Sequence, residues 1–494
     1  MTSSVTLQGA QGRQITVQTG LFIDNEFVPA SNNATLDVEN PNTATIIAQV
    51  SAAQASDVDR AVRSSQKAFA TWGRSDPGTR RTLLLKLADL VETHGPELAS
   101  LEAIEGGLLY RDSLGLHVTQ SVDNLRYFAG WADKLDGVSL PIPSGVAYTR
   151  REPIGVCAAI VPWNSLMILF WKLAPAIAAG NTIVIKTAEL TPLWAQKAAE
   201  LIKEAGFPPG VINIICGLGR EAGQALAEHP VVRKIAFTGS SVTGRQIMQS
   251  AARSNLKKVS LELGGKGPSI VFADADWENA LLWTTMGITA SNGQICAAGS
   301  RIYVQDTIYE KFIQEFSRRS RDAVHGDPLL DETTKGAVAS KAQLDKILSY
   351  VGKAKQTKAR LLHGGQPLPG KGHFMANTAF ADVDQDDAIM REEIFGPFAS
   401  IAPFSTEDEV IRKANDSDLG LNSAVFTNDV SRAFRVSEAI ETGTVTVNCW
   451  AMLNANTPFG GVKESGFGRD SGQEALDNWT VTKTVKFNIL PPKL

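Results

Sequence analysis

Hydrophobic and polar positions follow two different periods along this chain, one typical of helices and one of strands. Over residues 56–104 apolar side chains recur every three or four positions, as on one face of an α-helix. Ser56 is the candidate N-cap, and a second helical stretch covers 81–101. From Ile154 onward, short apolar runs alternate with helical stretches, a pattern that predicts an open parallel sheet with helices on its faces.

The apolar runs predict strands in two successive blocks. In the first block they lie at 156–161, 182–185, 211–215, 234–237 and 259–263, with helices at 194–205 and 219–227. The second block, from about 265 to 460, repeats the alternation with helices at 277–290, 309–324 and 407–415 and strands at 301–305 and 399–403. We therefore expect two α/β domains.

The C-terminal segment 481–489 follows a period of two, which predicts a strand. Its odd positions are apolar except Lys483, and its even positions are polar. An exposed strand edge pairs readily with another strand. Pairing within the chain and pairing with another subunit's sheet are both open.

Composition excludes several classes of protein. A chain of 494 residues with 43% hydrophobic and 20% charged residues can bury large cores, which is untypical of disordered or fibrous proteins. The 48 basic and 52 acidic residues give a net charge of −4, which offers no electrostatic basis for binding nucleic acid or a membrane. The longest apolar stretch, 166–179, contains Lys172 and Pro175 and is shorter than the roughly 20 residues of a membrane span.

The termini and the cysteines indicate the cytoplasm. The N-terminus has no signal or transit pattern. The final Pro-Lys-Leu differs at its first position from the peroxisomal Ser-Lys-Leu, so a chance C-terminus is favoured. Four cysteines in so long a chain do not form a disulfide framework, which suits a reducing compartment. We expect no metal site.

One glycine-containing turn is a candidate phosphate site. In 237–244 a strand leads through Gly239 and Gly244 into a helix, and Ser240 can hydrogen-bond phosphate. In 217–223 the third glycine is one residue late for the dinucleotide pattern, as in an ordinary loop that enters a helix. Strand–glycine–helix turns are common, so neither segment decides the function alone.

The four cysteines differ in their surroundings. Cys157 and Cys216 lie in apolar runs, where cysteine is usually a small buried hydrophobe, and Cys449 ends a strand-like run. Cys296 lies in the small, polar loop 291–300, where backbone N–H groups would lower its pKa. It is the candidate reactive thiol.

Glu262 is the candidate carboxylate. Strand alternation places it on the face opposite Val259, Leu261 and Leu263, directly before a Gly-Gly turn. Ligands of open α/β sheets bind at the carboxyl ends of the strands. The alternative is a solvated strand end.

Seven blocks together resemble one family. They are Pro-Trp-Asn at 162–164, Lys-Thr-Ala-Glu-Leu-Thr-Pro at 186–192, the turn 237–244, Leu-Glu-Leu-Gly-Gly-Lys at 261–266, Gly-Gln-Ile-Cys-Ala-Ala-Gly-Ser-Arg at 293–301, Glu-Glu-Ile-Phe-Gly-Pro at 392–397, and Pro-Phe-Gly-Gly-Val-Lys-Glu-Ser-Gly at 458–466. In this order and over nearly the whole length, the chain resembles the NAD(P)-dependent aldehyde dehydrogenase superfamily, most closely its broad retinal and mitochondrial-type branch.

The resemblance implies an α/β fold with two open Rossmann-type domains and a small β oligomerisation region. The implied NAD(P)-binding domain comprises 1–131 and 152–264, and the catalytic domain 265–464. Residues 132–151 and 475–494 would form the oligomerisation region of a homodimer or homotetramer.

The resemblance also implies a covalent mechanism for oxidising an aldehyde to its acid. Cys296 would attack the aldehyde, with the Asn164 side chain and the Cys296 N–H stabilising the oxyanion. The thiohemiacetal would pass hydride to the cofactor, and Glu262 would activate the water that hydrolyses the thioester.

The implied cofactor is NAD, with NADP as an alternative. The matching positions are Lys186 and Glu189 for the adenosine ribose, Gly239, Ser240 and Gly244 for the pyrophosphate, and Glu393 and Phe395 for the nicotinamide side, with Trp163 as a further cofactor-binding position. Of these, Glu189 would repel a 2′-phosphate and Lys186 would attract one.

The implied substrate tunnel is where the chain departs from the family. The matching positions are Gln120, Trp171, Ala290, Ile295, Ala297, Met452, Leu453 and Phe459. After Asn164 the family has one residue and a proline, whereas this chain has Ser165-Leu166 and is one residue short before Trp171, which would turn a helix by about 100°. Relatives often have a large aromatic residue at Ala290, so we expect medium or bulky apolar aldehydes to be preferred over acetaldehyde, unless neighbouring side chains fill that space.

Two other functions are open on sequence alone. A CoA-acylating semialdehyde dehydrogenase shares the scaffold, but that branch typically lacks the glutamate matched by Glu262. A non-catalytic homologue is the second, and the intact set of Cys296, Asn164 and Glu262 weighs against it.

Overall fold

The first large sheet has a parallel centre built as a mononucleotide-binding unit. The computed structural model describes residues 3–143 and 145–489 of the chain. In the eight-stranded sheet the centre runs β11-β10-β9-β12-β13, so the first strand of the unit, β9, lies in the middle, and a ligand crevice is expected where the order reverses. In sheet order the strands are β23 (Gly466–Phe467), β13 (Lys258–Glu262), β12 (Lys234–Thr238), β9 (Val156–Ile160), β10 (Thr182–Thr187), β11 (Ile212–Cys216), β3 (Leu21–Ile23) and β4 (Glu26–Val28).

The second large sheet has seven strands and belongs to the C-terminal half of the chain. All its neighbouring pairs are parallel except β16 with β17. In sheet order the strands are β16 (Arg360–His363), β17 (Thr378–Ala381), β18 (Phe398–Phe404), β15 (Arg301–Gln305), β14 (Pro268–Val271), β20 (Asn422–Phe426) and β21 (Thr444–Val447).

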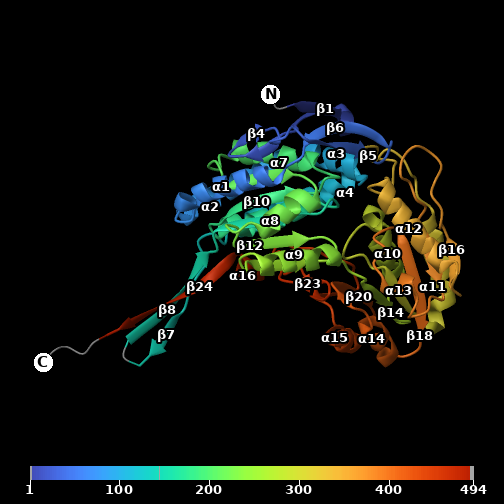
Figure 1. Cartoon of the computed structure of the whole chain (residues 1–494). Helices are drawn as coiled ribbons and strands as arrows, with labels where there is room; N and C mark the ends of the chain where they lie inside the picture. Colours follow the sequence, from blue (N-terminus) through green and yellow to red (C-terminus); the bar gives the residue numbers. More distant parts are fainter. Residues whose placement is uncertain (1–2, 144, 490–494) are drawn as a thin grey trace.

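Helices flank both sheets, and the two α/β units lie side by side (Figure 1). The first unit carries α1 (Ala55–Trp72), α2 (Pro77–Thr93), α3 (Gly95–Gly106), α4 (Tyr110–Asp112), α5 (Thr119–Ala129), α6 (Met167–Ala178), α7 (Leu193–Ala205), α8 (Gln224–Glu228) and α9 (Ser241–Arg253). The second carries α10 (Trp277–Thr289), α11 (Tyr309–Arg321), α12 (Lys341–Ala354), α13 (Ala388–Arg391), α14 (Glu407–Asn415) and α15 (Val430–Ala439), and α16 (Glu474–Trp479) precedes the last strand.

A three-stranded sheet projects from the body of the molecule (Figure 1). It consists of β7 (Ser139–Ile142), β8 (Gly145–Pro153) and β24 (Thr480–Asn488), with β8 in the centre. The predicted C-terminal strand is thus confirmed, and its partner is β8 of its own chain. The outer edge of β24 has no partner strand among the described residues.

The remaining strands form small two-stranded sheets. They are β1 (Ser4–Gln8) with β2 (Gln14–Gln18), β5 (Thr35–Asn40) with β6 (Thr45–Ser51), and β19 (Leu419–Gly420) with β22 (Val462–Lys463).

The predicted long helix of residues 56–104 is wrong in its boundaries. The chain forms α1, α2 and α3 there, because Asp76 caps a new helix that begins at Pro77, and a further helix starts at Gly95. Ser56 is not the N-cap: Gln54 is, and its backbone N–H donates to the Asp57 carboxylate at 2.9 Å. The expected helix over 309–324 ends earlier, at Arg321.

None of the helices in the described ranges is long and apolar enough to cross a membrane. The apolar stretch noted in the sequence forms α6, which is buried against the first sheet with Lys172 and Pro175 inside it. The Pro-Lys-Leu terminus lies outside the described residues.

Candidate active site

Cys296 lies in a loop whose backbone is closely constrained. After α10 ends, Ser291 and Asn292 have positive φ angles of 46° and 58°, and the Asn292 side chain donates to the carbonyl of Ala337 at 2.9 Å. A Cβ on Gly293 would lie 2.1 Å from the Gly396 carbonyl oxygen, so this position requires glycine. The loop therefore holds Cys296 at a fixed place between α10 and β15.

The expectation of a lowered pKa for the Cys296 thiol is wrong for this conformation. Burial, with a smaller effect of the carboxylates of Glu393 and Glu262, raises the pKa to about 12 against the opposing effect of nearby backbone N–H groups. Cys296 is a neutral thiol here. Its proton must therefore be removed before it can attack a carbonyl.

Glu262 ends β13 and is buried, which excludes the solvated strand end. Its side chain is 4% exposed, and neither carboxylate oxygen has a hydrogen-bond partner among the described residues. Burial raises the pKa of Glu262 well above its ordinary value, and the charge of Asp470 raises it further. Asp470 is itself paired with the buried Lys172, with 2.6 Å between Nζ and Oδ2. The carboxyl group is thus poised to hold a proton.

Asn164 is fixed against the cysteine loop. Its Nδ2 donates to the carbonyl of Gln294 at 2.9 Å, two residues before Cys296, and the side chain is buried. The segment after it is anchored by Glu102, whose Oε1 accepts the backbone N–H of Leu166 at 2.6 Å. Asn164 can thus present a side-chain N–H beside the thiol.

One cavity brings the catalytic candidates and most cofactor candidates together. Its wall is formed by Pro162, Trp163, Asn164, Thr238, Gly239, Ser240, Glu262, Leu263, Gly264, Cys296, Gln343, Lys346, Glu393 and Phe395. The rings of Trp163 and Phe395 meet edge to face with centroids 5.4 Å apart. A nucleophile, a carboxyl group and an amide donor therefore share one cavity with the glycine turn.

The glycine turn fits a dinucleotide phosphate. Ser240 caps α9, accepting from Thr243 N at 3.3 Å, and so the turn lies at the N-terminus of a 13-residue helix. The buried Thr238 Oγ1 has no hydrogen-bond partner among the described residues. A Cβ on Gly244 would lie 2.8 Å from Leu263 Cδ2, so glycine lets the helix approach β13.

Lys186 and Glu189 lie outside this cavity, at the carboxyl end of the nearby strand β10. Their side chains form an ion pair of 3.5 Å, with Lys186 buried and Glu189 partly exposed. The structure therefore does not bring these two cofactor candidates into the wall of the Cys296 cavity.

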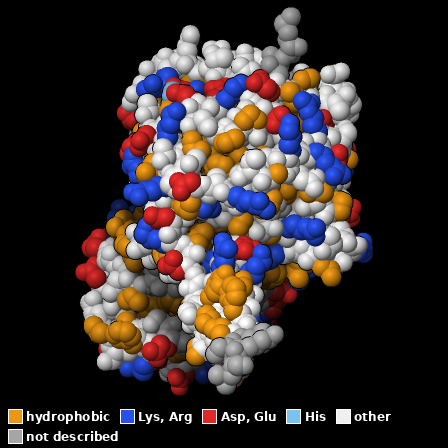
Figure 2. All heavy atoms as spheres, turned by 90° about the vertical axis from the view of Figure 1, so that its left-hand side faces the viewer, with side chains coloured by type: hydrophobic (Ala, Val, Ile, Leu, Met, Phe, Trp, Pro, Cys, Tyr) orange, Lys and Arg blue, Asp and Glu red, His pale blue; other side chains and the backbone are white. Residues whose placement is uncertain are grey.

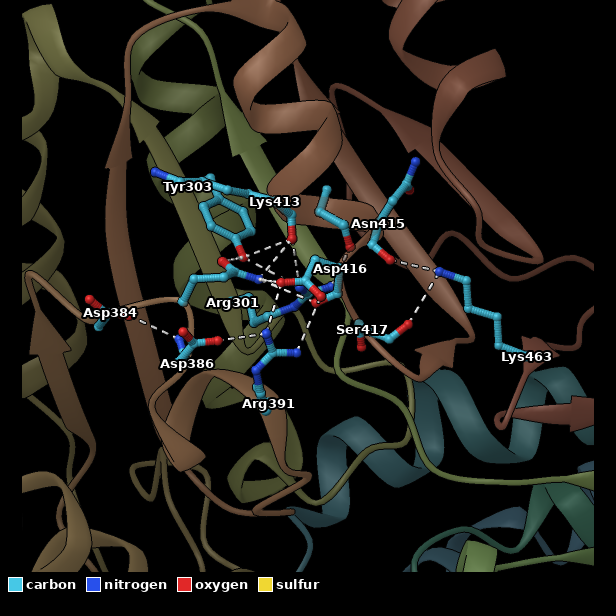
Figure 3. Close-up of polar contacts among 12 residues, drawn as sticks. Arg301, Tyr303, Asp384, Asp386, Arg391, Lys413, Asn415, Asp416, Ser417 and Lys463 are labelled. Atoms are coloured by element: carbon cyan, nitrogen blue, oxygen red, sulfur yellow. Dashed lines mark hydrogen bonds and ion pairs between the residues drawn. The ribbon is translucent and has the colours of Figure 1, made fainter.

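A buried arginine ties the cysteine loop to the turn after Glu262. Arg301 donates to the carbonyls of Lys266 and Ala414, both at 2.8 Å, and Figure 3 shows it beside Tyr303 and Lys413. A Cβ on Gly265 would lie 2.2 Å from the Cys296 carbonyl oxygen. The turn after Glu262 and the cysteine loop therefore pack backbone to backbone.

Comparison with known proteins identifies the family. The family model described as "Aldehyde dehydrogenase family" matches residues 27–485. The chain belongs to the aldehyde dehydrogenase family. It is 48% identical over 490 residues to an aldehyde dehydrogenase of Alternaria alternata, covering 99% of each chain, and 45% identical over 476 residues to human retinal dehydrogenase 2, covering 95% of this chain and 92% of the relative.

A solved relative has the same fold. The NAD+ complex structure of the aldehyde dehydrogenase from Bacillus cereus superposes with a TM-score of 0.94 at 42% identity, covering 96% of this chain and 97% of the other. The predicted family and the predicted fold of Rossmann-like parallel sheets are therefore confirmed.

Most tunnel candidates of this aldehyde dehydrogenase line a second cavity of about 200 Å³. Trp171, Ala297, Met452, Leu453 and Phe459 are in its wall, with no charged side chain among the lining residues. Gln120 lies next to it, its Nε2 donating to the Leu453 carbonyl at 3.3 Å. In the segment after Asn164, which we expect to be one residue shorter than in the family, Trp171 lies in the wall of the cavity. Leu166 and Phe170 of the same segment are buried in the core.

The other two tunnel candidates lie elsewhere. Ile295 packs against the core of the C-terminal half. Ala290 lines a cavity beside α10 and is not in the wall of the second cavity, so its place in the tunnel stays a prediction. The helix α10 ends at Thr289 and the chain then turns through the positive φ of Ser291, so Ala290 faces the loop between α3 and α4.

Six lining residues of the Cys296 cavity are absent from the set of predicted site residues: Pro162, Thr238, Leu263, Gly264, Gln343 and Lys346. The first four lie inside the sequence blocks named above, which were the available signal. Gln343 and Lys346 come from α12, far along the chain, and Gln343 Nε2 donates to the carbonyl of Phe395 at 2.7 Å. Only the fold brings α12 to this place.

Proposed function

We propose that this aldehyde dehydrogenase oxidises aldehydes to carboxylic acids with NAD+ and water, through a covalent intermediate on Cys296. The observation that carries the proposal is the cavity that Cys296, Glu262 and Asn164 share with Gly239 and Phe395. NADP+ is the alternative cofactor.

The first half of the reaction is acylation of Cys296. The sulfur adds to the aldehyde carbon once its proton has left, and the negative charge that develops on the oxygen accepts hydrogen bonds from Asn164 Nδ2 and the Cys296 backbone N–H. Removing one such donor typically costs about 10²–10³-fold in rate. A bound nicotinamide would supply the hydride acceptor. Loss of the hydride would convert the thiohemiacetal on Cys296 into a thioester.

The second half is hydrolysis, for which Glu262 is the proposed base. The carboxylate takes a proton from water as the water attacks the thioester carbon, the C–S bond breaks, and the Cys296 thiolate leaves and regains a proton from the Glu262 carboxyl group. Burial makes Glu262 a stronger base than a solvated carboxylate, because its pKa is raised.

Trp163, Gly239, Ser240, Gly244, Glu393 and Phe395 are proposed to bind the cofactor, with Lys186 and Glu189 at its adenosine ribose. The preference for NAD+ rests on Glu189, whose partly exposed carboxylate would repel a 2′-phosphate. The Bacillus cereus relative, described as an NAD+ complex, supports this choice.

The proposed substrates are medium or bulky apolar aldehydes. The second cavity supports this proposal because its wall contains the apolar side chains of Trp171, Met452, Leu453 and Phe459. Ala290 no longer supports this preference, since it lies in a different cavity.

A homodimer or homotetramer is proposed, with 132–151 and 475–494 as the oligomerisation region and the domain boundaries given above. Figure 2 shows hydrophobic side chains gathered on the projecting end of the molecule, flanked by Lys and Arg. Val146 and Phe487 on that sheet are 44% and 54% exposed. We place the enzyme in the cytoplasm, where its free cysteines stay reduced.

The test is NADH formation from a panel of aldehydes without CoA. We expect turnover in wild type, with a higher kcat/KM for hexanal than for acetaldehyde, because burial of a longer apolar chain stabilises the complex. Cys296→Ala should abolish turnover and retain NAD+ binding, and Cys449→Ala is the matched control. An absolute requirement for CoA, or turnover in Cys296→Ala close to wild type, would refute the proposal.

A further inference from the structure

A cavity of about 360 Å³ lies beside α10, apart from the Cys296 cavity. Its apolar side includes Leu108 and Leu109 from the loop after α3, Leu281 and Met286 on α10, and Ala290. We name it the α10 cavity. Its volume is in the range of small-molecule sites.

The wall of the α10 cavity also contains a buried lysine without an acidic partner. Lys335 is 3% exposed, and its Nζ donates to the carbonyl of Thr289 at 2.5 Å. Within residues 3–143 and 145–489, no carboxylate forms an ion pair with it. Burial lowers the pKa of Lys335 to about 7, although the charge of Asp112 opposes this. A buried ammonium group is costly unless it is paired.

The other cations of the cavity already have acidic partners. Arg319 pairs with Glu278 at 2.7 Å and with Glu315 at 2.8 Å, and Arg111 lies 3.6 Å from Asp112. Lys335 is therefore the group at which an additional anion would gain most.

Two polar side chains in the same wall also lack partners. The buried Thr285 Oγ1 and Asn377 Oδ1 form no hydrogen bond with any described residue, and Asn377 is 6% exposed. The Thr285 hydroxyl can donate to a carboxylate, and the Asn377 oxygen can accept from a hydroxyl or from water. The wall of the cavity thus contains buried polar atoms that have no hydrogen-bond partner among the described residues.

We propose that the α10 cavity binds a small apolar monocarboxylate, whose carboxylate pairs with Lys335 and whose tail lies along Met286 and Ala290. This site is separate from the one proposed for aldehyde oxidation, since neither Cys296 nor Trp171 is in its wall. The chemical class is that of the enzyme's own products.

A ligand in this cavity would act on the cysteine loop. Lys335 holds the Thr289 carbonyl, and Ala290, Ser291 and Asn292 form part of the wall a few residues before Cys296. A carboxylate there does not occupy the aldehyde's place. It therefore changes turnover without competing with the aldehyde.

The first experiment measures inhibition of the full-length enzyme by hexanoate. In wild type we expect hexanoate to inhibit with a noncompetitive component against the aldehyde. In Lys335→Met the inhibition constant of this component should rise about tenfold or more, because the anion loses the cation with which it pairs. Basal turnover should persist in Lys335→Met. Lys341→Met, an exposed lysine paired with Asp345, is the matched control. Purely competitive inhibition in wild type, or an unchanged noncompetitive component in Lys335→Met, overturns the proposal.

A second measurement does not need turnover. By calorimetry without cofactor, hexanoate should bind more tightly than the uncharged hexanamide, and Thr285→Val should weaken hexanoate binding if Lys335→Met fails to fold. Equal binding of hexanoate and hexanamide contradicts the site.

The pH dependence of binding has a defined sign. A carboxylate stabilises the ammonium form, so binding weakens as the pH rises above the Lys335 pKa of about 7. Asp112 and Asp322 are the acids in the same wall, and Arg111 and Arg319 are its other cations. Burial raises the pKa of Asp112, which acts in the same direction. Binding that is independent of pH through this range overturns the role of Lys335.

Discussion

In the proposed mechanism the buried carboxyl group of Glu262 is needed for hydrolysis of the thioester and not for acylation. Glu262→Gln removes the base and keeps the shape, so acylation should survive while hydrolysis of the thioester slows by roughly 10²–10⁴-fold. We expect a burst of about one NADH per active site followed by slow turnover. Stopped-flow absorbance measures both phases. Equal loss of the burst and of the steady-state rate would show that Glu262 also removes the thiol proton.

The charges behind Glu262 should set the pH dependence of hydrolysis. Asp470 raises the pKa of Glu262 and Lys172 lowers it. Because Glu262 acts in its deprotonated form, activity is lost as the pH falls through its pKa. Asp470→Asn lowers that pKa and should move the acidic limb of kcat to lower pH.

Lys172→Met is the control for this prediction, and it should move the same limb to higher pH. Either change disrupts a buried ion pair and lowers the free energy of unfolding by about 3–5 kcal/mol. This loss of stability alone would not move the acidic limb of the kcat–pH profile. Limbs that move in the same direction in both variants would contradict the electrostatic account.

The catalytic candidates could be named from sequence because each lies in a short local motif. Cys296, Glu262 and Asn164 stand at the ends of strands or in short loops, and the structure brings them into one cavity. The high pKa of the Cys296 thiol could not be predicted, because it depends on the distant carboxylates of Glu393 and Glu262. Lys346 was missed for the same reason, since only the folding of α12 against the cavity brings it near Cys296.

At the scale of elements, the loop that carries Asn164 depends on a neighbouring helix. Glu102 on α3 accepts the Leu166 N–H at 2.6 Å and the His117 Nδ1–H at 2.9 Å. His117 lies in the π-helical turn Ser113–Val118, so three segments meet at one carboxylate. This anchor lies where the chain departs from its family.

Glu102→Ala should therefore impair acylation by displacing Asn164. A buried N–H left without a partner costs about 1–3 kcal/mol, and loss of the oxyanion donor approaches the roughly 10²–10³-fold effect of removing it. Rapid hydride transfer should slow while the Kd for NAD+ is unchanged. Glu102→Gln keeps an acceptor for Leu166 and should restore most of the rate. Wild-type burst rates in Glu102→Ala would exclude the anchoring role.

Strands were easier to predict than helix ends. Runs such as 183–185 are apolar throughout because both faces of the parallel sheet are covered. The break between α2 and α3 was missed because the apolar period continues on both sides of it. Only His94, Gly95 and Pro96 mark the break in the sequence. The position of Ala290 depends in turn on the positive φ of Ser291, which the apolar pattern does not encode.

At the scale of the whole molecule, the projecting sheet has one apolar face near its tip. Phe487 on β24 pairs in register with Val146 on β8, and its ring stacks on Tyr148 with centroids 6.0 Å apart. Phe487 is 54% and Val146 44% exposed, and the outer edge of β24 is unpaired among the described residues. An exposed apolar face beside a free edge favours association with a second copy of the chain.

Phe487→Glu should therefore shift the protein toward the monomer. The change removes about 1.5–3 kcal/mol of apolar burial from each copy and places a charge in the contact. Lys486→Glu is the matched control, because Lys486 pairs with Ala147 and faces the opposite side of the same strand. Light scattering after size exclusion gives the mass of each variant over a dilution series. A dimer or tetramer that persists in Phe487→Glu at every dilution would exclude this face as the contact, and dissociation in Lys486→Glu alone would assign the contact to the other face.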